Sequence, residues 1–267
     1  MELWQVVLLS VVEGLTEFVP VSSTGHLILL SRLLGLKGPA VDAFLVVVQL
    51  GALLAAVVYY RKTIGETIVG IVQKRPAALL LFRNLILGSL PLLAVGYLLG
   101  KRIKAQLFAP LPVALALGVG GLLMLLIERH RRRHAATFES ASALPPKQAL
   151  TVGLCHLFAL WPGTSRSLAS MSGALIAGLP TKAAADYAFL LAIPTLGTAT
   201  VYELLKERHT LLAEVGLFHM SIGLAVSFAV GWLVIAAFLR YLRGHGLGLL
   251  ALYRVVLAAV VLWLWRF

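Results

Sequence analysis

The stretch FLVVVQLGALLAAVVYY, residues 44 to 60, contains one strongly polar side chain, Gln49, and no charge. A run of this length and composition is typical of a helix that crosses a bilayer, which takes roughly 20 mostly apolar residues. The run LALGVGGLLMLLI, residues 115 to 127, has the same character. The chain is therefore expected to be an all-α polytopic membrane protein.

The composition of the whole chain points the same way. Of its 267 residues, 60% are hydrophobic and 13% are charged, a balance outside the range of soluble globular domains. The formal net charge is +12, but the basic residues lie almost entirely in the short connections between apolar runs, where they act as topology signals. We therefore expect membrane lipids around the protein and no nucleic acid as a partner.

Six uninterrupted apolar runs are long enough to cross the membrane, whereas two further apolar regions are broken midway by polar residues. Each half of a broken region has roughly 10 to 14 residues, which is too few to span, so each region is expected to form a re-entrant helix-loop-helix hairpin. Irregular backbone at membrane depth must be buried in protein or line a wet cavity. The expected spans cover residues 42–60, 84–100, 111–128, 184–204, 216–240 and 247–266, and the hairpins cover 4–35 and 148–179.

An internal repeat relates the two hairpins, because PVSSTG at 20–25 parallels PGTSRS at 162–167. Each half of the chain, 1–134 and 147–267, holds one hairpin and three spans. An odd number of crossings turns the second half upside down relative to the first. The sequence therefore predicts a single integral membrane domain, residues 1–267, built as an inverted-topology repeat with a polar site near the midplane.

The distribution of basic residues predicts the orientation. The side that holds the connections 61–75, 129–147 and 240–246 and the ends of the second hairpin carries twelve Lys or Arg, and the opposite side carries eight. The richer side is expected to be cytoplasmic. Both termini then lie outside.

The break in the first hairpin lies within EGLTEFVPVSSTGH, residues 13 to 26. Glu13 and Glu17 are four residues apart and share one helix face. One such charge inside a membrane costs about 2.5–3.5 kcal/mol on translocon scales, so a shared proton, an arginine or a divalent cation must offset the pair. The polar side chains that follow are Ser22, Ser23, Thr24 and His26.

In the second break Arg166 lies between Ser165 and Ser167. An arginine within the membrane marks a candidate functional site, and its planar fork matches phosphate oxygens. Gly163 lets the backbone approach a ligand closely. The alternative is a structural ion pair between Arg166 and one of the two glutamates, and both arrangements can hold in the resting state.

Together the two breaks supply carboxylates, hydroxyls, an imidazole and a guanidinium. This set suits phosphoryl transfer, in which a cation and an arginine hold the phosphate while a hydroxyl attacks. A site at membrane depth implies a lipid substrate. The alternative is a transporter of a lipid or a small anion with a midplane site, since broken helices in inverted repeats are typical of transporters.

The motifs EGLTEFVPVSSTGH and PGTSRS resemble those of the undecaprenyl pyrophosphate phosphatases of the bacitracin-resistance type, and the resemblance covers nearly the whole chain. It implies hydrolysis of undecaprenyl diphosphate to undecaprenyl phosphate and inorganic phosphate, which recycles the lipid carrier of peptidoglycan synthesis and confers bacitracin resistance. It also implies a multi-pass protein of the bacterial plasma (inner) membrane, a polyprenyl diphosphate substrate and a divalent cation, Mg²⁺ or Ca²⁺. A homo-oligomer is left open.

The resemblance also indicates the roles of individual residues. The catalytic residues are expected to be Glu13, Glu17, Ser23, His26 and Arg166, with Glu13 and Glu17 also holding the cation. Substrate contacts are expected from Ser22, Thr24, Gly163, Ser165, Ser167 and Ser170, the last standing where the family pattern has Thr. We expect Ser23 to attack the terminal phosphorus while His26 takes its proton. Attack by His26 itself, with Ser23 only donating a hydrogen bond, is the alternative.

Four polar residues lie in or beside the other apolar runs. Gln49 is expected to form an interhelical hydrogen bond. Asp186 is expected to be a helix N-cap, and His156 a hydrogen-bonded interior histidine. Arg254 is expected either to extend to the cytoplasmic face or to reach phosphate.

Overall fold

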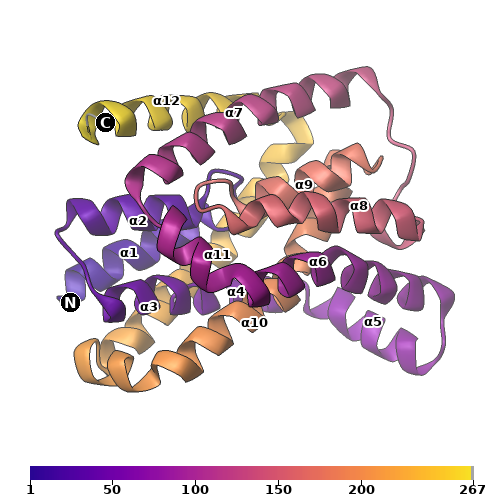
Figure 1. Cartoon of the computed structure of the whole chain (residues 1–267). Helices are drawn as coiled ribbons and strands as arrows, with labels where there is room; N and C mark the ends of the chain where they lie inside the picture. Colours follow the sequence, from indigo (N-terminus) through magenta and orange to yellow (C-terminus); the bar gives the residue numbers. More distant parts are fainter. Residues whose placement is uncertain (266–267) are drawn as a thin grey trace.

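The structure is a computed structural model that describes residues 1–265, apart from the side chains of Lys101 and Lys104 (Figure 1). All regular elements in this part of the chain are helices and it contains no strand, which confirms the expected all-α class. The helices are α1 (Leu3–Thr16), α2 (Ser23–Leu33), α3 (Pro39–Val47), α4 (Gln49–Tyr59), α5 (Arg61–Val72), α6 (Pro76–Leu107), α7 (Pro110–Arg133), η1 (Ala141–Ala143), α8 (Pro146–His156), η2 (Leu157–Leu160), α9 (Arg166–Ile176), α10 (Thr181–Glu214), α11 (Leu217–Gly244) and α12 (Gly248–Trp265).

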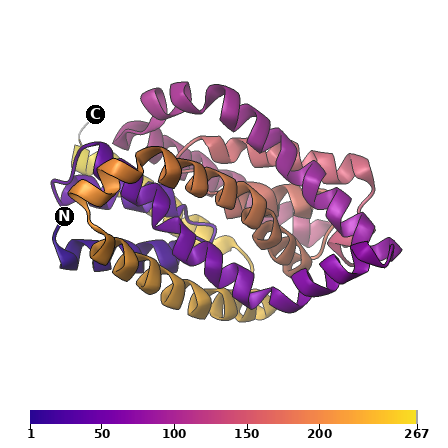
Figure 2. The ribbon, with the colours of Figure 1, turned by 90° about the horizontal axis from the view of Figure 1, so that it is seen from below.

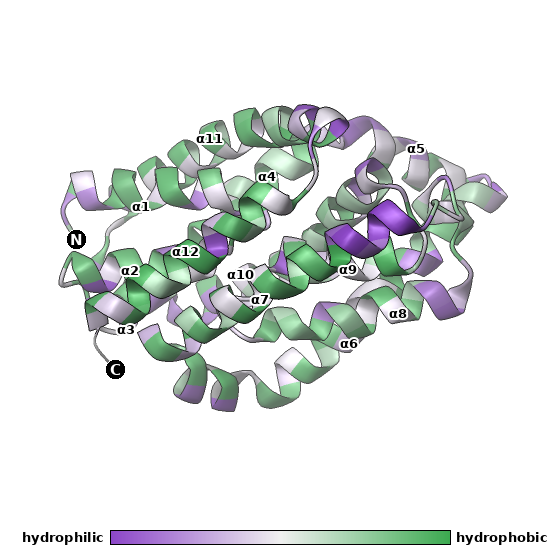
Figure 3. Ribbon diagram, turned by 90° about the horizontal axis from the view of Figure 1, so that it is seen from above, coloured by the Kyte–Doolittle hydropathy of each residue, from purple (hydrophilic) through white to green (hydrophobic). Residues whose placement is uncertain are grey.

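Within residues 1–265, six helical segments are long and apolar enough to cross a membrane. They are Pro39–Tyr59, which combines α3 and α4, Pro76–Gly100 of α6, and the whole of α7, α10, α11 and α12. Each overlaps one of the expected spans, so the prediction of six spans is confirmed. Figure 3 shows hydrophobic residues along the lengths of these helices and hydrophilic residues mostly toward their ends.

The two broken apolar regions form helix pairs. Residues 17–22 join α1 to α2, and residues 157–165, which include η2, join α8 to α9. The two helices of each pair pack against each other. In Figure 1 the pairs extend from opposite ends of the molecule and their loops meet near its centre. This is the arrangement expected of two re-entrant hairpins, and their re-entrant path through a bilayer remains a prediction.

Each hairpin packs on a long helix from the other half of the chain, α1 on α11 and α8 on α6. Helices α7 and α12 lie side by side (Figure 1), and Figure 2 shows α3 and α4 between α10 and α11. Small residues allow such close packing: a Cβ atom at Gly51 of α4 would lie 2.4 Å from the Leu224 carbonyl oxygen of α11. The reciprocal packing is what an internal repeat produces, and its inversion across the membrane remains a prediction.

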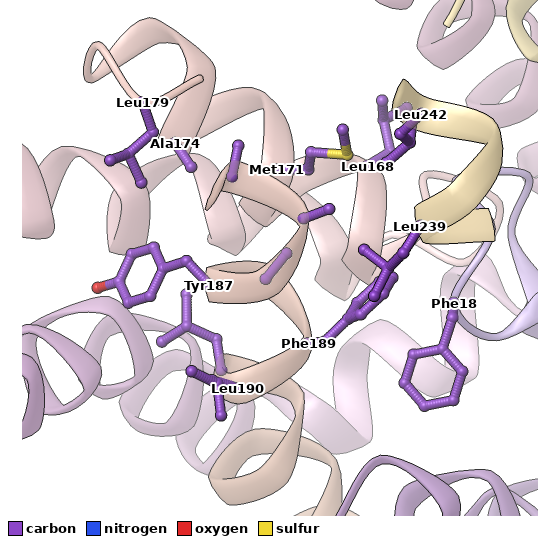
Figure 4. Packing of buried hydrophobic residues seen from close by; sticks show 14 of the residues in the cluster. Phe18, Leu168, Met171, Ala174, Leu179, Tyr187, Phe189, Leu190, Leu239 and Leu242 are labelled. Atoms are coloured by element: carbon purple, nitrogen blue, oxygen red, sulfur yellow. The ribbon is translucent and has the colours of Figure 1, made fainter. Parts of the chain in front are cut away.

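The loop between α1 and α2 is anchored in the largest apolar cluster through Phe18 (Figure 4). The Phe18 ring is 1% exposed and meets Phe189 of α10 edge to face, with ring centroids 5.0 Å apart. Leu168 and Met171 of α9 belong to the same cluster. Because Phe18 directly follows Glu17, this packing fixes the end of α1 relative to α9 and α10.

Two features of the fold differ from the sequence-based expectation. The connection 61–75 contains helix α5, which packs on α6. Asp186 is not an N-cap, because α10 begins at Thr181 and Asp186 is an interior residue of this helix. There it accepts hydrogen bonds from the Tyr60 hydroxyl at 2.7 Å and from the Lys182 ammonium at 2.9 Å.

Candidate active site

The two glutamates of α1 lie one helical turn apart, as expected, but they have different partners. Glu13 is fully buried, and within residues 1–265 neither of its carboxylate oxygens has a hydrogen-bond partner. Glu17 caps the end of α1. Its Oε1 accepts a hydrogen bond from Arg166 Nη2 at 2.6 Å, and its Oε2 accepts one from the Ser23 hydroxyl. The arginine therefore compensates Glu17, and Glu13 still requires a proton or a cation.

Arg166 joins three elements at this carboxylate. Its Nη2 donates to Glu17 and also to Gln49 Oε1 of α4, at 2.7 Å. Gln49 is buried and donates in turn to the Leu45 carbonyl oxygen at 3.0 Å, so the expected interhelical hydrogen bond of Gln49 is confirmed. Across residues 1–265 no hydrogen bond reaches the other two guanidinium nitrogens. The Arg166 side chain remains 18% exposed.

The loops start their helices in the same way. Ser22 and Ser165 have left-handed backbone angles, with φ of 76° and 80°, and each side chain accepts a 3.2 Å hydrogen bond from the backbone N–H three residues later. Positive φ at a non-glycine residue is uncommon and clusters at functional sites. This geometry makes Ser22 the equivalent of Ser165. The alignment of PVSSTG with PGTSRS instead places the next residue, Ser23, opposite Ser165. Ser23 and Arg166 are then the first residues of α2 and α9.

His26 lies in the first turn of α2, but the structure does not bring its ring to Ser23. The imidazole Nδ1 is 2.7 Å from the Ser22 carbonyl oxygen, and Nε2 is 2.6 Å from the Tyr253 hydroxyl of α12. The Ser23 hydroxyl donates to Glu17 instead. In this structure the Ser23 hydroxyl therefore bonds to Glu17 and not to His26, both of whose ring nitrogens have other partners.

The serines of the second loop position the loop itself. The Ser165 and Ser167 hydroxyls are 2.9 Å apart, and Ser167 donates to the Val19 carbonyl oxygen of the first loop at 3.3 Å. Ser170 is buried and donates to the Arg166 carbonyl oxygen one turn earlier, at 2.8 Å. The hydroxyl of Ser170 therefore contacts its own helix rather than the space in front of Arg166.

Arg254 is a part of the site whose role the sequence did not indicate. It is fully buried in α12 and donates from Nη1 to the Pro20 carbonyl oxygen at 3.1 Å. Its Nη2 donates to the Gly163 carbonyl oxygen at 2.8 Å and to that of Ala116 at 3.1 Å. Arg254 thus connects both loops to α7 from a fully buried position, and its guanidinium does not extend to the surface of the protein. The available signal was a charge inside an apolar span.

Two glycines make room for this arrangement. A Cβ atom at Gly120 of α7 would lie 2.2 Å from Arg254 Nη2. Gly163 has φ of 102°, which side chains rarely tolerate, and a Cβ there would lie 2.6 Å from the Val113 carbonyl oxygen. The loop containing Gly163 can therefore lie directly on α7.

Nine of the eleven predicted site residues fall into two groups. In the first group, Glu17, Ser23 and Arg166 meet at the centre of the site, and Glu13 lies beside them. Those that shape or brace the loops are Ser22, Gly163, Ser165, Ser167 and Ser170. Thr24 lies in the first turn of α2 and is half-buried, and its hydroxyl has no hydrogen bond among the described residues.

The residues present fit a hard divalent cation. Glu13 offers two buried carboxylate oxygens that lack a partner within residues 1–265, next to the carboxylate of Glu17. The described residues contain no group of three or more His, Cys, Asp or Glu placed to hold a metal. One or two carboxylates completed by water and substrate phosphate oxygens are typical of Mg²⁺ sites. Glu13 and Glu17 would hold such an ion.

Fold and site together define a polytopic helical membrane protein whose two broken hairpins meet at a serine, two carboxylates and an arginine. The profile described as "Bacitracin resistance protein BacA" matches residues 6–260, and the chain belongs to this family. It is 51% identical over 263 residues to a protein of Sorangium cellulosum named "Undecaprenyl-diphosphatase", covering 97% of this chain and 85% of that one. It is 44% identical over 269 residues to "Undecaprenyl-diphosphatase 1" of Chromobacterium violaceum, covering 98% and 96%. It is 40% identical over 267 residues to "Undecaprenyl-diphosphatase" of Sphingopyxis alaskensis, covering 99% of both.

Proposed function

We propose that the protein is an integral membrane phosphatase that hydrolyses undecaprenyl diphosphate to undecaprenyl phosphate and inorganic phosphate. The observation that carries the proposal is the meeting of Ser23 and Arg166 at the two oxygens of Glu17. A hydroxyl, its proton acceptor and a guanidinium at one point are the groups that attack on a phosphate requires. The activity recycles the lipid carrier of peptidoglycan synthesis and accounts for the bacitracin resistance of the family name.

The first step is attack by Ser23. Its hydroxyl already donates to Glu17, so Glu17 can take the proton as Ser23 Oγ forms a bond to the terminal phosphorus. The bond between that phosphorus and the bridging oxygen breaks, and undecaprenyl phosphate leaves with the bridging oxygen. The free nitrogens of Arg166 stabilise negative charge on the equatorial oxygens, a contribution that for one donor is typically about 10²-fold to 10³-fold in rate.

The second step releases phosphate. Water attacks the phosphoserine phosphorus, the bond to Ser23 Oγ breaks, and Glu17 returns its proton to that oxygen. Inorganic phosphate leaves with the oxygen and the protons of the water. Direct attack by His26 is the competing mechanism, and it requires the Tyr253 hydroxyl, now 2.6 Å from Nε2, to move aside.

A divalent cation, Mg²⁺ or Ca²⁺, is part of the proposal. Bound by Glu13 and Glu17, it would neutralise charge on the diphosphate and favour its approach to the buried carboxylates. Glu13 itself supplies the two carboxylate oxygens that have no other partner among residues 1–265. Glu17 has further tasks in this scheme, because one of its oxygens accepts the Ser23 hydroxyl and the other accepts Arg166.

We also propose that the protein is a multi-pass protein of the bacterial inner membrane with both termini outside. The excess of Lys and Arg in the connections 61–75, 129–147 and 240–246 supports this orientation. The beginning of α1 and the end of α12 lie at the same end of the molecule (Figures 1 and 2), which is consistent with an even number of crossings.

The experiment is a phosphate-release assay on the detergent-purified protein with undecaprenyl diphosphate. We expect release of inorganic phosphate by the wild type and a loss of about 10²-fold or more in Glu17→Gln, since general-base catalysis contributes that much. The control Glu66→Gln makes the same change at an exposed position of α5 and should be as active as the wild type. A protein that moves the lipid across vesicle membranes but releases no phosphate would be a transporter, and the proposal would be wrong.

A further inference from the structure

The attack by Ser23 leaves one pair of groups unused, His26 and Tyr253. The His26 ring sits between α2 and α12, with Nδ1 2.7 Å from the Ser22 carbonyl oxygen and Nε2 2.6 Å from Tyr253 Oη. The two rings are parallel to within 5°, with centroids 5.8 Å apart.

This geometry determines which ring nitrogen carries the proton. A carbonyl oxygen can only accept, so Nδ1 must be the donor to Ser22. In the uncharged ring Nε2 then carries the lone pair, and the Tyr253 hydroxyl must donate to it.

Tyr253 also has a fixed position relative to the loops. The next residue, Arg254, donates to the carbonyl oxygens of Pro20 and Gly163. Two consecutive residues of α12 therefore contact the site. Arg254 bonds to the backbone of the loops, and Tyr253 bonds to the imidazole of His26. A phenylalanine at 253 would preserve the packing of the ring and remove only the donor.

We infer that Tyr253 is a positioning residue, whose hydroxyl holds His26 in the Nδ1–H tautomer and fixes the direction of its basic Nε2. The inference deepens the proposed function and, for its effect on turnover, rests on it. In Tyr253→Phe the ring keeps only the Ser22 contact, so it can rotate and change tautomer. The unprotonated Nε2 is the base that can take a proton from the water of the second step, so loss of this one neutral hydrogen bond corresponds to a fall in kcat on the order of 2-fold to 10-fold. KM for the lipid diphosphate should not change, because Tyr253 does not hold substrate.

The direct test uses ¹⁵N NMR of the detergent-solubilised protein labelled at its seven histidines, with the His26 signals identified by their absence in His26→Asn. We expect a protonated Nδ1 and an unprotonated Nε2 for His26 in the wild type, and an Nε2 signal in Tyr253→Phe shifted toward that of a free or exchanging ring. Tyr97→Phe is the matched control, because Tyr97 is 85% exposed, and its spectrum and kcat should equal those of the wild type.

Two results would overturn the inference. One is a wild-type His26 with the proton on Nε2, and the other is a Tyr253→Phe protein whose His26 signals and kcat are both unchanged. The NMR measurement needs no substrate. If the protein releases no phosphate but the His26 tautomer is as expected, the proposed function fails and the structural role of Tyr253 stands.

Discussion

Replacement of Arg254 by methionine tests whether this residue holds the two loops in place. The guanidinium donates three hydrogen bonds to backbone carbonyl oxygens, at 2.8, 3.1 and 3.1 Å, from a fully buried side chain. A hydrogen bond to a charged group contributes about 1.5–3 kcal/mol, while removal of a buried charge returns several kcal/mol of desolvation cost. We therefore expect Arg254→Met to lose about 2–4 kcal/mol of stability.

The effect on activity should exceed the effect on stability. The acceptors in Pro20 and Gly163 belong to the loops that carry Ser23 and Arg166 to Glu17. A displacement of reacting groups by 1 Å can cost about 10²-fold in rate, so we expect kcat to fall by at least about that factor.

The assay measures phosphate release and thermal unfolding of the same purified samples. Arg240→Met is the control, since Arg240 is exposed on α11, and both of its values should match the wild type. Arg254→Lys should be intermediate, because an ammonium keeps the charge but cannot span both loops with a planar fork. Wild-type kcat in Arg254→Met would show that the loops do not depend on this residue.

Two further predictions concern the charged groups at the centre. Arg166→Lys should lose most of its phosphate release although the charge is kept, because an ammonium lacks the fork that bridges phosphate oxygens; near-normal release would mean that charge alone suffices. EDTA should suppress phosphate release and added Mg²⁺ or Ca²⁺ should restore it, because the buried oxygens of Glu13 have no other partner within residues 1–265. Full activity in EDTA would mean that the carboxylates share a proton instead.

The sequence predicted the features that depend on local composition. Apolar runs identified the spans, and the polar breaks FVPVSSTG at 18–25 and WPGTSRS at 161–167 identified the two loops that meet. The four-residue spacing of Glu13 and Glu17 placed them on one face of α1. These predictions succeed because helix length and side-chain period are set by the neighbouring residues.

Other features required the tertiary structure. The partner of His26 is Tyr253, 227 positions away, and no local pattern brings the two together. The acceptors of Arg254 are backbone carbonyl oxygens, which every residue possesses, so the sequence cannot single them out. The positive φ of Ser22 and Ser165 makes these two residues equivalent in the two loops, one residue away from the pairing in the motif alignment. Residue type alone does not indicate that a serine adopts a positive φ.

Attack by Ser23 is tested most directly by trapping the phosphorylated enzyme. Protein mixed with undecaprenyl diphosphate carrying a labelled terminal phosphate is quenched within one turnover, and the labelled residue is located by mass spectrometry. The account predicts phosphate on Ser23, no labelled protein in Ser23→Ala, and labelling retained in Ser22→Ala. An acid-labile phosphate on His26, retained in Ser23→Ala, would contradict it.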